Sequence, residues 1–351
     1  MDVAILASAR FEIGPPFAGG LEMQTHVLAE GLVHRGHDVT VYAAGGSGSF
    51  RVRPLPVDFM ASAPARRDVS AGPAAQLAEH HGYLDAIVQL STAGHDLTHI
   101  NAVHHLPFAC HRLIPGVVSA TLHTPPTPWL ESALALADAH GGVPHLVSVS
   151  EANAAAWLPM SVAGVIPNGV DLRRWIPGSG GDGVAWWGRL VREKAPHMAI
   201  DAARRADTVI RLMGPRHDDA YFAEEIEPRL GEGVIYLGHL DVEEICAVAG
   251  RSSVALVTPD WDEPFGLVVA EALACGTPVA AFDRGAIGEV LDEDTGVLVG
   301  AGDINGLAAA IGAAAQLDRV ACRRRAEEHF SATRMVDAYE SWFTELIEDA
   351  A

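Results

Sequence analysis

Hydrophobic and polar residues form two alternating patterns along the chain. Short, continuously apolar runs such as residues 2–7 (DVAILA) and 253–257 (SVALV) are typical of strands buried within parallel sheets. Between such runs, apolar side chains recur every three or four residues, as in residues 21–36, which indicates helices with one buried face. Regular alternation of buried strands and amphipathic helices predicts an α/β fold built on parallel sheets.

The first predicted βαβ unit brings a glycine-rich loop to the carboxyl end of a strand. Residues 2–7 are followed by a Gly- and Pro-rich segment ending at Gly19 and Gly20, then by a helix (21–36) and a strand (37–44). In α/β proteins, ligands bind at this end of the sheet. The glycine pair therefore indicates close approach of the backbone to a ligand, although a simple chain reversal explains it equally well.

The most informative stretch follows the apolar run 253–257. A polar loop leads to residues 263–266 (EPFG), and apolar residues then recur at helical spacing until Gly276. Pro264 suits a first helical position, and Gly276 suits the end of a helix. The sequence therefore predicts a helix N-terminus after a buried strand, where unpaired amides and the helix dipole favour an anionic or hydroxyl-rich ligand.

Two carboxylates accompany this predicted helix. Glu263 lies at its start, and Glu271 lies about two turns inside an apolar segment. Because glutamate is rarely buried without a polar partner, we expect Glu271 to face an internal base or the hydroxyl groups of a ligand. The alternative is that Glu263 only complements the helix dipole and that Glu271 is solvated.

Two cations flank another predicted turn between a strand and a helix. Arg189 and Lys194 follow the apolar run 184–188, and a helix is predicted from residues 195–196 onward. A guanidinium fork, an ammonium point charge and free helix amides together suit a diphosphate. Lys194 is the only lysine in the chain, which strengthens it as a functional candidate, whereas we expect Arg192 to be solvated.

Histidines provide further candidates. His123 ends the predicted strand 117–124, directly before a proline run that cannot continue a strand, so we expect it at a carboxyl edge of the sheet. On position alone, a surface histidine is the simpler interpretation of His123. Four other histidines lie close together in sequence but without fixed ligand spacing, and we expect no metal site from them. These are His99, His104, His105 and His111.

Composition restricts the class of protein. With 351 residues, of which 49% are hydrophobic and 20% charged, the chain is long enough for two domains with separate cores. A net charge of −21 argues against binding to nucleic acid or to anionic lipid surfaces. The sequence has no CxxC pair, no signal-like leader and no apolar run long enough to span a bilayer, so we expect a cytoplasmic protein.

The stretch EPFGLVVAEALACGTPVAA resembles the signature of the retaining GT-B glycosyltransferases of family 4, which use nucleotide-sugar donors. Five landmarks match in order: GG-x-E at 19–22, His123, PNGVD at 167–171, GR-x4-K at 188–194 and E-x7-E at 263–271. The resemblance implies two Rossmann-like domains facing across a cleft. Residues 1–170 would form an acceptor domain, to which a final helix (331–351) returns, and residues 171–330 a donor domain.

The resemblance also implies roles for the matching residues. Arg189 and Lys194 would neutralise a leaving diphosphate, Glu271 would hold ribose, Glu263 would hold the sugar, and His123 would contact the sugar during transfer. No metal or cofactor is expected, because cationic side chains would do this work. The remaining donor-binding positions are Gly19, Gly20, Met213, Gly214, His239, Leu240, Phe265, Gly266 and Leu267.

Substrates and rival functions stay open at this stage. A UDP-sugar is the favoured donor, with a GDP-sugar as the alternative, and a small soluble acceptor is favoured over a lipid because the chain is acidic. One rival is another GT-B enzyme, such as a nucleotide-sugar epimerase or a phosphorylase. Lys194 would suit a pyridoxal Schiff base there, but its position after Gly188-Arg189 argues against this. The other rival is a non-catalytic protein that binds sugar nucleotides.

Overall fold

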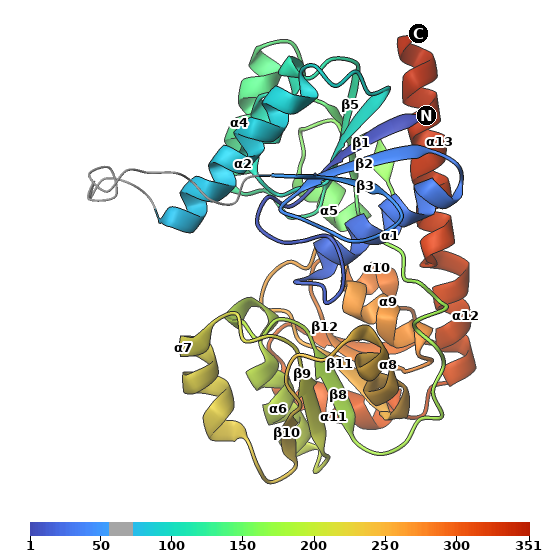
Figure 1. Ribbon diagram of the computed structural model, residues 1–351. Helices are drawn as coiled ribbons and strands as arrows, with labels where there is room; N and C mark the ends of the chain where they lie inside the picture. The colour runs from blue at the N-terminus through green and yellow to red at the C-terminus, as the bar shows by residue number, and fades with distance from the viewer. Residues whose placement is uncertain (56–72) are drawn as a thin grey trace. The chain divides into compact units, whose positions relative to one another are not determined.

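The computed structural model describes residues 1–55 and 73–351, and the chain divides into two compact units (Figure 1). The first unit consists of residues 1–148, 156–166 and 336–351, and the second of residues 149–155 and 167–335. Each unit contains one parallel sheet covered by helices, so the predicted α/β architecture is confirmed.

In the part of the chain that the structure describes, the first unit has a seven-stranded sheet in the order β3-β2-β1-β4-β5-β6-β7. All neighbouring strands are parallel, and Val3 of the interior strand β1 pairs with Val39 of β2 on one side and Leu97 of β4 on the other. The strands are β1 (Asp2–Leu6), β2 (Asp38–Ala43), β3 (Arg51–Pro54), β4 (Leu97–Ile100), β5 (Val117–Leu122), β6 (His145–Ser148) and β7 (Gly164–Val165).

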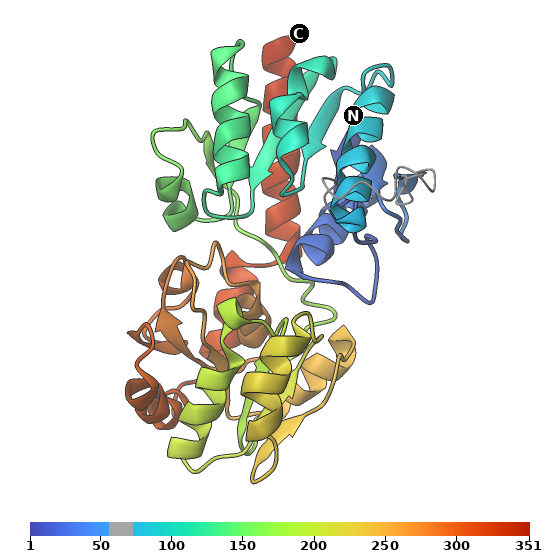
Figure 2. The same cartoon turned by 90° about the vertical axis from the view of Figure 1, so that its left-hand side faces the viewer.

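Helices cover both faces of this sheet because its strands are apolar on both sides. Side chains of α2, α3 and α4 form one core with the sheet, and α1 and α13 lie on the other face, as Figures 1 and 2 show. The helices are α1 (Gly20–His34), α2 (Ala74–Leu90), α3 (His105–Ala109), η2 (His111–Leu113), α4 (Pro128–Ala139) and α13 (Ala332–Ala350).

The last helix, α13, begins in the second unit and continues into the first, as the resemblance implied. Tyr339 and Phe343 are fully buried, and the hydroxyl of Tyr339 lies 2.8 Å from Thr121 Oγ1 of β5. The buried His99 packs against both aromatic rings and hydrogen-bonds Ser119 and Thr121, so this histidine belongs to the core.

The second unit has a six-stranded parallel sheet in the order β10-β9-β8-β11-β12-β13 among the described residues. Its strands are β8 (Val184–Trp187), β9 (Ile210–Met213), β10 (Val234–Tyr236), β11 (Val254–Val257), β12 (Val279–Asp283) and β13 (Gly296–Gly300). Its helices are α5 (Glu151–Ala156), η3 (Arg192–Lys194), α6 (Pro196–Arg205), α7 (Asp219–Tyr221), η4 (Phe222–Ile226), η5 (Glu227–Arg229), α8 (Val242–Arg251), α9 (Leu267–Ala274), α10 (Ile287–Val290), α11 (Ile304–Ala314) and α12 (Arg319–His329).

The start of α9 corrects one sequence expectation. The helix begins at Leu267, so Pro264 is not a first helical residue but part of the preceding loop. Gly266 precedes the helix with φ of 89°, a left-handed conformation that side chains other than glycine rarely adopt. A turn that glycine makes without strain at Gly266 therefore separates residues 263–265 from the helix.

The polar, glycine-rich residues 177–183 predict a linker between the two domains, but in the structure they pack inside the second unit. The amide of Gly178 donates to Cys275 O, and that of Gly180 donates to Gly250 O. A Cβ on Gly178 would lie 2.2 Å from Gly250 O, so the glycine allows the two backbones to meet. The composition that suggested a linker thus serves close packing.

Other boundaries differ less. Residues 50–57 (FRVRPLPV) predict an edge strand, and β3 lies at the edge of the sheet. Positions 56 and 57, like most of the irregular Pro- and Ser-rich segment 47–74, lie outside the described residues. The sequence predicts one helix near residues 219–229, but the structure has three short helical segments there, α7, η4 and η5. None of the helices in the described residues is both long and apolar enough to cross a membrane.

Candidate functional site

The carboxyl edge of the second sheet is lined by backbone. Gly188, Gly214 and Gly238 directly or closely follow the neighbouring strands β8, β9 and β10, all with positive φ. A Cβ on Gly214 would lie only 1.9 Å from Gly188 O, and the Gly214 amide donates to Gly238 O at 2.8 Å. The predicted donor-binding pair Met213-Gly214 therefore presents its backbone here, since the Met213 side chain is fully buried.

Two loops at this edge are bonded to each other. The Thr258 hydroxyl donates to Lys194 O and Ala195 O, both at 3.1 Å, and it accepts from the Trp186 indole N–H. The Asp260 amide donates to Glu193 O at 2.7 Å. These bonds hold the loop after β8 and the loop after β11 together, although they are about 65 residues apart in sequence.

Lys194 and Glu263 form an ion pair across these two loops. The Trp261 indole N–H also donates to Glu263, at 3.0 Å, and Lys194 Nζ lies 4.9 Å from the Trp261 ring centroid. The side chains of the pair are only 24% and 12% exposed, so solvent screens them less than a surface pair. Sequence reasoning missed Trp261, whose only signal was an aromatic residue in a polar loop.

Arg189 forms an ion pair with a different carboxylate. Its guanidinium donates to Glu193 at 2.7 Å, and both side chains are more than one-third exposed. Arg192 lies apart from this pair, near Glu224 and over the Tyr221 ring. The structure therefore gives the two expected phosphate-binding cations different environments: Lys194 is fixed between loops, whereas Arg189 is exposed at the turn.

Glu271 lies on α9 with 5% of its surface exposed. Its Oε2 accepts a hydrogen bond of 2.6 Å from the indole N–H of Trp187, the last residue of β8. The predicted polar partner is thus an indole rather than a base, and it leaves one carboxylate oxygen for a ligand. The sequence did not indicate Trp187, because a tryptophan in an apolar strand is most simply interpreted as a core residue. Its indole N–H nevertheless needs a hydrogen-bond acceptor when it is buried.

Burial raises the pKa of Glu271 to about 8; the Trp187 hydrogen bond opposes this rise, and Cys246 adds to it. The pKa in an unfolded chain is about 4.5, so the folded state holds a proton between these two values. Stability from this group is therefore full below pH 4.5 and is lost as pH rises toward 8, because ionisation without solvent is costly.

We expect Glu271→Gln, which cannot ionise, to escape this loss. The difference in melting temperature between the variant and the wild type should increase in favour of the variant from pH 5 to pH 9. This increase corresponds to roughly a few kcal/mol in the free energy of unfolding. Differential scanning fluorimetry across this range measures it, with Glu293→Gln, an exposed carboxylate of the same unit, as the matched control. A difference that does not change with pH would contradict a protonated Glu271.

In the first unit, His123 lies directly after β5, as predicted, and is half-buried. Its Nε2 lies 2.7 Å from Asn101 Oδ1, and the Asn101 amide donates to Gln24 Oε1 and Thr25 Oγ1. Because this orientation makes Asn101 Oδ1 an acceptor, Nε2 of His123 carries a proton. Burial also lowers the pKa of His123, so the neutral ring offers Nδ1 as an acceptor.

Asn101 is fully buried after β4 and was not predicted, although a polar residue after an apolar strand was its signal. The network reaches α1, whose Gln24 follows Gly19 and Gly20 by about one turn. Gly19 precedes α1 in an extended conformation and Gly20 is exposed. The structure thus brings the glycine-rich turn and His123 together within the first unit.

The other predicted donor-binding residues can meet a ligand mainly through their backbone, because several of their side chains pack into the core. Phe265 is 3% exposed and packs edge-on against Phe330 at 5.8 Å, so only its backbone can meet a ligand. Leu267 starts α9, where the first amides have no intrahelical partner. His239 and Leu240 follow β10, and Leu240 packs partly into the core.

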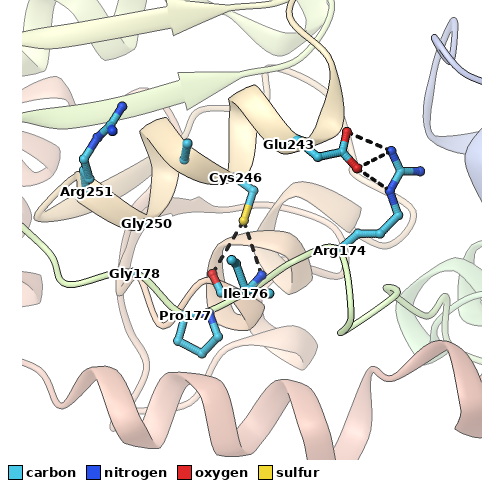
Figure 3. Close-up of a pocket in the computed structure, with 9 residues that line it drawn as sticks. Arg174, Ile176, Pro177, Gly178, Glu243, Cys246, Gly250 and Arg251 are labelled. Carbon is cyan, nitrogen blue, oxygen red and sulfur yellow. Dashed lines mark hydrogen bonds and ion pairs between the residues drawn. The ribbon is translucent and has the colours of Figure 1, made fainter.

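A pocket elsewhere on the second unit contains none of the predicted residues. It lies between α8 and the segment 174–178, where Arg174 pairs with Glu243 and the Cys246 thiol contacts the backbone of Ile176 (Figure 3). Cys275 Sγ lies 3.6 Å from Cys246 Sγ. None of its lining residues belongs to the site above, and we assign the pocket no part in that site.

Comparison with known proteins identifies two adjoining family models. Residues 18–174 match the model described as Glycosyltransferase Family 4, and residues 183–329 match Glycosyl transferases group 1. Glycogen synthase of Mycobacterium tuberculosis is 28% identical over 90% of this chain and 87% of its own. Phosphatidyl-myo-inositol mannosyltransferase of Propionibacterium freudenreichii is 29% identical over 79% and 77%.

Solved structures share the fold over nearly the whole chain. Sucrose-phosphate synthase of Thermosynechococcus elongatus is 20% identical with a TM-score of 0.81, covering 99% of this chain and 100% of that one. HepE of Anabaena, solved with UDP and glucose, is 19% identical with a TM-score of 0.76, covering 98% and 99%. Together with the two parallel-sheet units and the consecutive family matches, these similarities show that the chain belongs to the group 1 glycosyltransferases of the GT-B fold.

Proposed function

We propose that the protein is a retaining glycosyltransferase that transfers a hexose from a nucleoside diphosphate sugar, preferably a UDP-sugar, to a hydroxyl group. The observation that carries the proposal is the arrangement around Lys194. The chain's only lysine is held between two strand-end loops, and its partner Glu263 shortly precedes the helix that carries Glu271. The solved complex of HepE with UDP and glucose supports the choice of donor.

In this proposal, the donor lies along the carboxyl edge of the second sheet. Lys194 and Arg189 bind the diphosphate, and the free oxygen of Glu271 hydrogen-bonds the ribose hydroxyls. Glu263 binds sugar hydroxyls together with the amides at the start of α9. The glycine-lined edge after β9, with His239 and Leu240 after β10, contacts the base through the backbone.

The chemistry is stabilisation of charge rather than covalent catalysis by the protein. As the glycosidic bond opens, negative charge grows on the leaving diphosphate, and the two cations neutralise it. His123 contacts the transferred sugar through Nδ1, and retention of the anomeric configuration follows if the acceptor attacks from the face that the diphosphate leaves. We favour a small soluble acceptor, because the net charge of −21 disfavours docking to anionic lipid.

A screen of donors tests the proposal. UDP-, GDP-, ADP- and dTDP-sugars are compared by thermal shift, and the best donor is then incubated with candidate acceptors. NMR of the product distinguishes retention from inversion of the anomeric carbon. An inverted product, or binding of a donor without turnover with any acceptor, would contradict the proposed reaction.

We expect transfer to continue without a divalent ion, because Lys194 and Arg189 supply the positive charge that a metal otherwise gives. Donor hydrolysis or transfer is measured before and after treatment with EDTA, with rates expected to agree within about twofold. A loss of activity that added magnesium or manganese restores would contradict this expectation. A metal-dependent glycosyltransferase assayed in parallel confirms that the chelator is effective.

A further inference from the structure

Three imidazoles from two segments meet on the first unit. His80 lies on α2, and His104 and His105 lie at the start of α3, where one ring nitrogen of each is within 4.8 Å of the other two. Ring centroids are 4.3 Å apart for His104 and His105, and about 6 Å from each to His80. Across residues 1–55 and 73–351, no other group of histidine, cysteine and carboxylate side chains has comparable spacing.

The surroundings of the cluster hold the rings in fixed orientations. Tyr83 stacks on His104 with centroids 4.5 Å apart, and Trp129 of α4 stacks on His105 at 4.9 Å. All three histidines are half-buried. Imidazole is mostly neutral at pH 7, and the neutral ring is the form that binds a metal.

We propose that His80, His104 and His105 bind one divalent transition-metal ion, with zinc as the best match. Neutral imidazole is a favoured ligand of zinc, copper and nickel, whereas magnesium and calcium prefer oxygen. Three protein ligands leave a fourth position for water, which lies toward the solvent side of this half-buried cluster. The ion would fasten α2 to α3, and the site is independent of the donor residues on the second unit.

Coordination requires modest local changes. The three ring nitrogens lie within 4.8 Å of one another, whereas zinc–nitrogen bonds of about 2.0–2.1 Å place tetrahedral ligand atoms roughly 3.4 Å apart, so any wider pair closes by rotation of the side chains. Nδ1 of His104 also accepts a 3.2 Å bond from the Leu106 amide. Binding through Nε2 shifts the ring proton to Nδ1 and gives up this bond. One long hydrogen bond is a small loss beside coordination of a metal ion.

Metal titration tests the site directly. Protein without a histidine tag is stripped with chelator, and zinc chloride is titrated by calorimetry. We expect one ion per chain, and a visible absorption spectrum typical of tetrahedral coordination when cobalt(II) replaces zinc. His80→Ala and His105→Ala, on separate helices, should each weaken zinc binding at least about tenfold. His140→Ala removes an exposed histidine at the far end of α4 and should leave affinity unchanged.

Each outcome decides the proposal. Equal affinity and stoichiometry in wild type, His80→Ala and His105→Ala would assign zinc to other histidines and overturn it, as would a spectrum of octahedral cobalt(II) in the wild type. Circular dichroism of the metal-free variants checks that they fold. If one variant is unfolded, the other decides, and if both are, the cobalt(II) spectrum of the wild type does.

Discussion

Replacing Lys194 with alanine is expected to weaken binding of nucleoside diphosphate by about 10- to 100-fold while leaving the bare nucleoside almost unaffected. A hydrogen bond to a charged group contributes roughly 1.5–3 kcal/mol, which corresponds to one to two decades in affinity. Turnover should fall further, because charge on the diphosphate grows in the transition state. Calorimetric titration with UDP and uridine, together with transfer kinetics, measures both effects.

Two variants make this expectation specific. Arg192→Ala removes a cation from the same turn that lies near Glu224 instead, and it should bind both ligands as the wild type does. Glu271→Ala should weaken nucleoside and diphosphate alike, because both contain ribose. If Lys194→Ala weakened both ligands equally, the effect would come from disrupting the bonds between the two loops rather than from a lost phosphate contact.

Replacing His123 with alanine is expected to lower turnover by roughly 100-fold or more with little change in donor affinity. The expected effect is that of removing one preorganised polar contact from a transition state, about 10² to 10³ in kcat. Donor binding should persist because the proposed diphosphate and ribose contacts lie on the second unit. Steady-state kinetics and titration with UDP separate the two quantities.

Two further variants in the first unit test whether the effect is specific to His123. His145→Ala changes an exposed histidine at the amino end of β6, on the opposite edge of the sheet, and should leave turnover unchanged. Asn101→Ala keeps the imidazole but frees its orientation, so we expect a smaller fall in turnover and a changed pH profile. If His123→Ala kept the turnover of the wild type, His123 would have no part in transfer and the simpler interpretation as a surface histidine would apply.

Much of the fold was predictable because it depends on local patterns. Continuous apolar runs such as β5 and β11 can be buried only between two layers, so the parallel sheets followed from the sequence. The ends of strands were predicted within a few residues, and with them the edge positions of His123 and Lys194. Boundaries failed where glycine served packing or backbone geometry, as at Gly178 and Gly266.

The partners of the candidate residues were not predictable in the same way. Trp187 bonds Glu271 from β8 to α9, Asn101 bonds His123 between the ends of the neighbouring strands β4 and β5, and Trp261 bonds Glu263 within one loop. Their residue types fit several structural roles, and only the register of the sheet decides which one applies. The pKa of Glu271 likewise depends on the burial that the whole second unit provides.

The histidines illustrate the division between sequence and structure most clearly. The sequence grouped His99, His104, His105 and His111 by proximity along the chain. The tertiary structure buries His99 against α13, bonds His111 to Phe108 O, and brings His80 from α2 to the remaining two. The sequence by itself determined the alternating strands and helices, the helix-start motifs and the chain's single lysine. Only folding decided which side chains meet, because contacts depend on strand order and helix packing that no local pattern encodes.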